Sequence, residues 1–194
     1  MSIFDRLKNV AEKTAKDAAR SVGNTIGTKR ETFTFSALPE SLAEMQALPE
    51  AKLDTPFATA ALTVLALCAY AADRSTGTEM LNWLRGPRPL TAYDIQFIRD
   101  RLRGKDYLPR SYFSGATPEN NYTPVRPLVV TVIETAHSND QGAEGYITLY
   151  LDCGGADSPR PIRLRHKPST GQWFLWEQFL LPGIRTPAPA NPWA

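Results

Sequence analysis

The chain has 194 residues, enough for one sizeable hydrophobic core but not for several domains. Its composition is 42% hydrophobic and 22% charged, which excludes a chain that is disordered throughout, because enough apolar surface is available to offset the entropy lost on folding. The net charge of +2 is unevenly distributed: residues 1–30 carry +4, which leaves −2 for the remainder. An anionic partner is therefore expected to be attracted to the N-terminal segment.

Residues 2–22 have the pattern of a basic amphipathic helix, followed by a Gly-containing tether that ends near residue 28. Helices of this kind lie on anionic membranes, dock into the groove of a partner protein, or fold back onto their own domain or another copy of it. All three alternatives remain open from the sequence. The residues predicted to make the attachment are Ile3, Phe4, Leu7, Val10, Lys8 and Lys13.

The next part of the chain is predicted to be mainly helical. Residues 31–35 alternate like a short strand, and helices are expected over 40–46, 56–72 and 77–84, with a further helix capped by Thr91. Residues 55–72 carry no charge, but acids flank this stretch and it contains three threonines, so we interpret it as a buried helix and not a membrane span. Residues 107–127 have no regular period and are predicted to form a long ordered loop.

The last third of the sequence is predicted to form strands. Four segments, 128–136, 145–153, 161–167 and 172–181, are rich in β-branched, alternating or aromatic residues and are separated by turn residues. They predict an antiparallel meander of about four strands, with the neighbouring tryptophans in the core. The expected fold is α+β, with the helical half packed on the meander, as a single domain over 29–185 and a Pro-rich tail over 186–194.

The sequence contains no recognisable catalytic, metal or cofactor motif. There is no nucleophile elbow, phosphate-binding Gly-rich loop or zinc-binding helix, so neither a cofactor nor a metal ion is expected. The two histidines are interpreted as an exposed turn residue (His137) and a core residue (His166). Cys68 and Cys153 lie in apolar contexts and are expected to be buried free thiols, as is typical of a reducing compartment.

Two further surfaces are candidate binding sites. A pocket between the helices and the sheet, closed by the long loop, would serve a small-molecule-binding domain or an enzyme; its candidate residues are Tyr107, Tyr112, Phe113, Tyr122 and His166. The basic face of Arg163, Arg165 and Lys167 would suit nucleic acid, but nucleic-acid sites usually present exposed stacking aromatics as well. We favour a solvated strand face there over a nucleic-acid site.

Two stretches together resemble an uncharacterised bacterial family, a domain of unknown function. They are the opening Met-Ser-Ile-Phe-Asp-Arg-Leu-Lys octet and the block from Gly-Gly-Ala-Asp-Ser-Pro-Arg-Pro (154–161) to Gly-Gln-Trp-Phe-Leu-Trp-Glu (171–177). The resemblance implies that nearly all of the chain from about residue 32 belongs to that family, and it implies no activity. Helices followed by a curved meander ending in Gly-x-Trp also resemble the cone-shaped nuclear-transport-factor-like superfold, a likeness of fold that carries no function.

The sequence favours a non-enzymatic binding or interaction protein, attached through its N-terminal helix to an anionic membrane surface or a partner protein. Self-association into a homo-oligomer is also compatible with that helix. The alternative is a small-molecule-binding domain or enzyme with a pocket between helices and sheet. The expected location is the cytoplasm, with peripheral attachment to the membrane as a further possibility.

Overall fold

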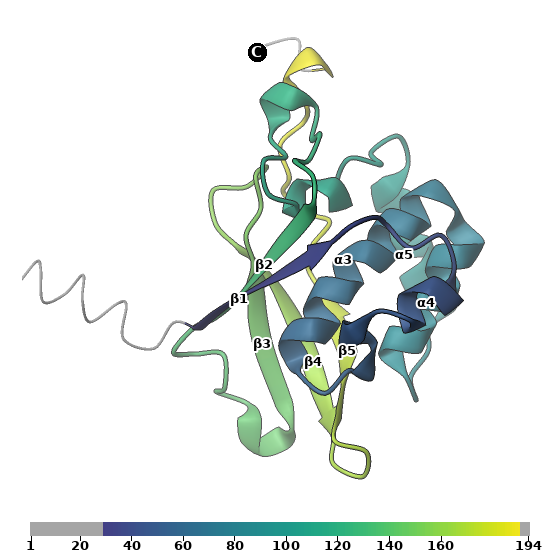
Figure 1. Cartoon of the computed structure of the whole chain (residues 1–194), viewed down its shortest axis with the longest axis vertical. Coiled ribbons are helices and arrows are strands. Elements are labelled where there is room, and N and C mark those ends of the chain that lie inside the picture. Colours follow the sequence, from purple (N-terminus) through teal and green to yellow (C-terminus); the bar gives the residue numbers. More distant parts are fainter. Residues whose placement is uncertain (1–28, 191–194) are drawn as a thin grey trace, which may run out of the picture.

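The computed structural model describes residues 29–190, so the predicted helix over 2–22, its tether and residues 191–194 lie outside the described part (Figure 1). The predicted α+β class is confirmed. The helices are α2 (Leu42–Gln46), α3 (Pro56–Ala72), α4 (Arg74–Arg85) and α5 (Ala92–Leu102). The strands are β1 (Lys29–Phe35), β2 (Leu128–Glu134), β3 (Tyr146–Leu151), β4 (Arg160–Lys167) and β5 (Gln172–Gln178).

The sheet has five strands, one more than the predicted meander, in the order β1-β2-β3-β4-β5 with all neighbours antiparallel. The additional strand is β1, which the alternation of residues 31–35 had indicated. Its alternation could not show which strand it pairs with. In the fold it pairs with β2 along its whole length, from Lys29 opposite Glu134 to Phe35 opposite Leu128. The two edges of the sheet are therefore β1 and β5.

Helix α3 is the centre of the core, and it begins and ends where the sequence predicts. The Thr55 hydroxyl accepts a hydrogen bond from the Ala58 N–H at 3.1 Å, and Pro56 occupies the first turn, where no N–H is needed. All residues from Phe57 to Tyr70 are buried, and the helix contacts every strand of the sheet. No helix among residues 29–190 is long and apolar enough to cross a membrane.

Helix α4 begins at Arg74, three residues before the predicted start at Gly77. The Asp73 carboxylate caps the helix by accepting a hydrogen bond from the Thr76 N–H at 2.8 Å. Gly77 therefore lies inside the helix. A Cβ at this position would come within 2.1 Å of Tyr70 Cα, so α3 and α4 approach each other backbone to backbone. Gly77 thus permits the close packing of the two helices.

The two faces of the sheet differ because only one is covered by helices (Figure 1). The inner face carries apolar residues that pair in register across the strands, such as Leu149 with Ile162 and Leu164 with Leu175. The outer face carries Tyr146 opposite Arg165. Between residues 29 and 190, no helix packs on this outer face. Its side chains are therefore available to solvent or to a ligand.

A β-bulge in β5 interrupts its pairing with β4 at Trp176. Leu164 is opposite Leu175, but Arg163 is opposite Glu177, so Trp176 is the extra residue. Trp176 is half-buried and contacts outer-face side chains, which corrects the prediction that the tryptophans of this strand belong to the core. Trp173, by contrast, packs partly against the core. A bulge has no signature in residue alternation, so the sequence did not indicate it.

The long loop after α5 is ordered by its tyrosines. The rings of Tyr107 and Tyr122 are stacked, with centroids 5.3 Å apart. The Tyr112 hydroxyl donates to the Leu180 carbonyl at 2.5 Å, and the Tyr122 hydroxyl donates to the Arg185 carbonyl at 2.6 Å. These bonds tie the loop to the segment after β5. Burial raises the pKa of the Tyr122 hydroxyl to about 12, so the group remains a donor at neutral pH.

The two cysteines are free thiols but differ in burial. Cys68 lies in α3 and is buried as predicted, and desolvation raises the pKa of its thiol to about 12. Cys153 follows β3 and is only half-buried, which corrects the prediction for this residue. Its thiol donates to the Ser111 hydroxyl at 3.2 Å. It lies in the loop that follows β3, beyond the end of the strand.

Candidate functional site

Two hollows follow one another along β5, at the edge of the sheet. The first has a volume of about 300 Å³ and lies between the α4–α5 turn and the ends of β4 and β5; we call it the basic hollow. The second has a volume of about 260 Å³ and lies between α5 and β5; we call it the apolar hollow. The residues common to both linings are Arg85, Arg88, Leu175 and Trp176. The hollows are therefore adjacent parts of one concave surface.

The basic hollow has an unbalanced charge. Its lining contains four bases and neither an aspartate nor a glutamate; the bases are Arg85, Arg88, Arg165 and Lys167. Among residues 29–190, no ion pair is found for Arg88, Arg165 or Lys167. Like charges held together without a counter-charge repel one another. An anion in this hollow would relieve that repulsion.

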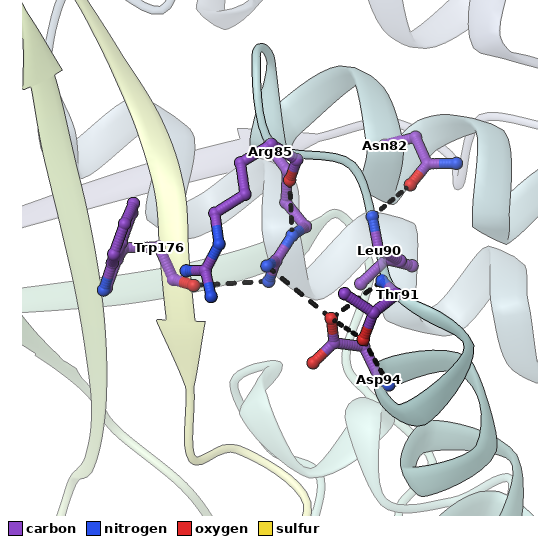
Figure 2. Close-up of polar contacts among 7 residues, drawn as sticks. Asn82, Arg85, Leu90, Thr91, Asp94 and Trp176 are labelled. Atoms are coloured by element: carbon purple, nitrogen blue, oxygen red, sulfur yellow. Dashed lines mark hydrogen bonds and ion pairs between the residues drawn. The ribbon is translucent and has the colours of Figure 1, made fainter.

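Arg85, in the last turn of α4, forms the base of the site and is only 7% exposed. Its Nε donates to the Arg88 carbonyl at 3.0 Å, and its Nη1 donates to the Trp176 carbonyl at 3.2 Å. Figure 2 shows the guanidinium between β5 on one side and the start of α5 on the other. The second bond satisfies a carbonyl on the edge strand, so Arg85 joins the helical layer to the sheet.

The charge of Arg85 is only partly compensated. Its nearest carboxylate is Asp94, whose Oδ2 lies 3.8 Å from Nη2, beyond hydrogen-bond distance. That carboxylate is already engaged in a capping box: it accepts hydrogen bonds from the Thr91 N–H and hydroxyl at 2.9 and 2.8 Å (Figure 2). A buried charge is costly unless it is paired. The positive charge of Arg85 can therefore be stabilised further by an anionic ligand.

The pKa values of this pair keep both groups charged at neutral pH. Burial lowers the pKa of the Arg85 guanidinium, and the neighbouring Asp94 opposes that effect. Burial acts to raise the pKa of the Asp94 carboxyl, but the hydrogen bonds from Thr91 and the Arg85 charge outweigh it, so this pKa lies below its usual value. An arginine stays protonated at any physiological pH, so the base of the hollow is permanently positive.

Cations and aromatic rings alternate across the outer face next to the basic hollow. Arg88 lies 4.2 Å and Arg165 5.1 Å from the centroid of the Trp176 ring. Arg165 and Arg163 each lie 4.6 Å from the ring of Tyr146. Ring stacking fixes the guanidinium groups without neutralising them. The donors of Arg88 and Arg165 are thus held in place at the mouth of the hollow, at little further entropic cost on binding.

The apolar hollow is lined mainly by aromatic and aliphatic side chains from α4, the α4–α5 turn, α5, β5 and the chain after β5. They are Leu81, Leu90, Tyr93, Phe97, Ile98, Leu175, Phe179 and Pro182. Tyr93 is 77% exposed and Phe179 is 49% exposed, so both rings border the hollow with much of their surface in water. Its two bases are matched in number by two acids, Asp94 and Glu177, so this hollow has no excess of positive charge.

The predicted pocket residues do not form one cavity. Tyr107 and Tyr122 stack on each other, as described above. Tyr112 and Phe113 line a third hollow of about 380 Å³, formed by residues 111–117 and 152–159 together with Thr131. His166 lies at the other end of the fold, among the residues lining the basic hollow, with its ring 4.8 Å from that of Trp173. The candidate attachment residues from Ile3 to Lys13 lie outside the described chain.

Neither the histidines nor the acidic residues form a recognisable catalytic or metal-binding arrangement. Within the described chain, no group of three or more His, Cys, Asp and Glu side chains could hold a metal ion. His137 has 83% of its side chain exposed, as predicted for a turn residue, and lies 3.4 Å from Asp140. The third hollow contains the Cys153 thiol, but its lining includes no histidine that could act as a base.

Sequence reasoning missed the bases that matter most here, Arg85 and Arg88. They flank the Gly86-Pro87 pair, which indicated only the end of a helix. Nothing in their spacing shows that they lie beside Arg165, nearly eighty residues later in the chain. The one available signal was the cluster Arg163, Arg165 and Lys167, which had been interpreted as a solvated face. Pairing of β4 with β5 brings this cluster next to an aromatic residue.

The fold and the site together define an α+β domain with a helix-covered antiparallel sheet and a basic, aromatic-bordered hollow at one edge. A family model described as "Domain of unknown function (DUF6935)" matches residues 37–188, and the chain belongs to this family. The match confirms the resemblance to an uncharacterised family. Searches of curated proteins and of solved structures gave no match. The likeness to the nuclear-transport-factor-like superfold therefore stays a prediction.

Proposed function

We propose that this domain is a non-catalytic binding module that takes a small anionic ligand in its basic hollow, through a phosphate group. The observation that carries the proposal is the presence of four bases and no acid around a hollow of about 300 Å³. Ligand sites of this size combine an apolar wall with a few fixed polar groups. Here Phe174 and Trp176 provide the wall and the arginines provide the donors.

The arginines suit an oxyanion better than a neutral ligand. A guanidinium presents its N–H groups as a planar fork that matches phosphate and carboxylate oxygens. Arg88 and Arg165 are held on aromatic rings, and Arg85 is held by two backbone carbonyls. Groups that are positioned before the ligand arrives lose little freedom on binding. This supports recognition of an anion at a defined position, and not only general attraction by charge.

Replacing Arg165 with glutamine should weaken phosphate binding at least about tenfold, because a charge-assisted hydrogen bond contributes about 1.5–3 kcal/mol. The measurement is isothermal titration of the full chain with phenyl phosphate at constant ionic strength. The matched control is Arg103→Gln, since Arg103 is 71% exposed and lies outside the hollow. The proposal is wrong if the wild-type chain does not bind phenyl phosphate, or if both variants weaken binding equally.

We further propose, from the sequence alone, that residues 1–28 attach the domain to an anionic membrane surface or a partner protein in a bacterial cytoplasm. The full chain should then pellet with phosphatidylglycerol vesicles at low salt and be released as the salt concentration rises. A chain that begins at residue 29 is the control and should stay in the supernatant. Pelleting of both chains, or of neither, would contradict membrane attachment; a change in oligomeric state on truncation would instead indicate self-association.

A further inference from the structure

The apolar hollow is the strongest unexplained feature next to the proposed anion site. Three large apolar side chains are exposed among residues 29–190, and two of them, Tyr93 and Phe179, border this hollow. Isolated exposed apolar residues are ordinary, but two rings on either side of an apolar depression indicate a contact surface. Neither ring is needed to complete the core, because Tyr93 is 77% and Phe179 49% exposed.

We propose that the ligand is a free amphiphilic anion, with its anionic group in the basic hollow and its apolar body in the apolar hollow. This inference rests on the proposed function, since it assigns the ligand class of the same site. The two hollows share Arg85, Arg88, Leu175 and Trp176, so a single molecule can occupy both. The Arg88 side chain, over the Trp176 ring, stands at the boundary between the two parts.

The distribution of charge gives the orientation of the ligand. In the apolar hollow, the two shared arginines are accompanied by Asp94 and Glu177, which disfavour an additional negative group. In the basic hollow, the same arginines are joined by Arg165 and Lys167 and by no acid. The electrostatic energy of an anionic group is therefore more favourable in the basic hollow than in the apolar hollow. The uncharged part of the molecule is left beside Tyr93 and Phe179, where it removes apolar surface from water.

The dimensions of the surface indicate a small molecule and not a membrane. The two hollows have volumes of about 300 and 260 Å³, and each is concave. They extend along the chain from Phe174 to Phe179, roughly 16 Å at the usual rise of a strand. A monomeric ligand with a short chain or ring fits these limits. A bilayer surface is flat on this scale and cannot bring its apolar interior into a side hollow of this size.

A series of ligands that differ only in the apolar part tests this inference. We expect the affinity of the full chain to rise from inorganic phosphate to butyl phosphate to octyl phosphate, by about tenfold or more between the last two, because each buried methylene is favourable. Free octanol, which lacks the anion, should bind much more weakly than octyl phosphate. The measurement is isothermal titration below the micelle-forming concentration of the longest ligand.

The matched variants separate this inference from the proposed function. Tyr93→Ser combined with Phe179→Ser should remove most of the gain from chain length while leaving the binding of inorganic phosphate, which has no apolar part, in place. Val125→Ser is the control, since Val125 is also an exposed large apolar residue, at 62%, but lies outside both hollows. Arg165→Gln should weaken all the phosphates by a similar factor.

Three results would overturn the inference. Equal affinity for butyl and octyl phosphate would show that the apolar hollow does not take part in binding. An unchanged gain from chain length in the double variant would place the apolar body elsewhere. Binding to phosphatidic acid vesicles without binding to free octyl phosphate would replace a free ligand with a lipid surface. In contrast, if no phosphate binds at all, the proposed function itself fails.

Discussion

Replacing Arg85 with methionine should lower the free energy of unfolding by about 3 kcal/mol and abolish anion binding. The side chain is only 7% exposed, and its loss would leave the carbonyls of Arg88 and Trp176 without their donors. Methionine fills much of the same volume, so the effect would come from the lost hydrogen bonds and charge and not from a cavity. Urea denaturation of the full chain measures the change.

The control for this prediction is Arg103→Met, since that arginine has 71% of its side chain exposed and should change stability by less than about 0.5 kcal/mol. Arg85→Lys should also be less stable than the wild type, because a lysine ammonium group lacks the planar fork of N–H groups with which arginine bonds two carbonyls at once. An Arg85→Met variant as stable as the wild type would contradict the structural role assigned to this guanidinium. Retained binding of phenyl phosphate would contradict its role in the site.

Replacing Gly77 with alanine should destabilise the domain by about 3 kcal/mol, even though alanine is the better helix former. The new Cβ would lie 2.1 Å from Tyr70 Cα and 2.3 Å from its backbone nitrogen. Because these are backbone atoms where the end of α3 meets the start of α4, no side-chain rotation can make room. The helices would have to move apart and open the core. Thermal unfolding followed by circular dichroism measures the loss.

Gly142→Ala is the matched control for this substitution. The nearest atom to a Cβ at position 142 is Asn139 Cβ at 3.9 Å, an ordinary contact, so the free energy of unfolding should change by less than about 0.5 kcal/mol. If Gly77→Ala left the free energy of unfolding unchanged or raised it, that result would contradict the close packing of α3 against α4. At this position packing outweighs helix propensity, which by itself would favour alanine over glycine.

Much of the secondary structure followed from local sequence signals. Helix α3 begins and ends as predicted because Thr55, Pro56 and a continuous apolar run act within one segment. The start of α5 was likewise set by Thr91, whose capping box with Asp94 needs only residues three apart. The strands were found by alternation, and their ends by turn residues. In each case the deciding interactions lie within a few residues of one another, so they are readable in the sequence.

The candidate site could not be predicted in the same way. Arg85, Arg165 and Trp176 come from a helix end and two strands, and their proximity depends on how the helical layer meets the edge of the sheet. The bulge at Trp176 is a single extra residue in the pairing register, and it brings Glu177 opposite Arg163. The long loop was predicted to be ordered and its tyrosines to line a pocket. In the structure, the hydroxyls of Tyr112 and Tyr122 bond backbone carbonyls 68 and 63 residues away, which no local pattern indicates.

By itself, the sequence determined that this protein is an α+β domain with a buried central helix, an antiparallel meander and a basic N-terminal segment, because hydrophobic periodicity, caps and turns are local properties. Only the tertiary structure decided that β1 completes the sheet, that Gly77 is a packing contact, and that bases from distant segments surround one hollow without an acid. Those outcomes depend on register and on the approach of layers. Such long-range relations arise from the summed packing of the whole chain, and no single segment encodes them.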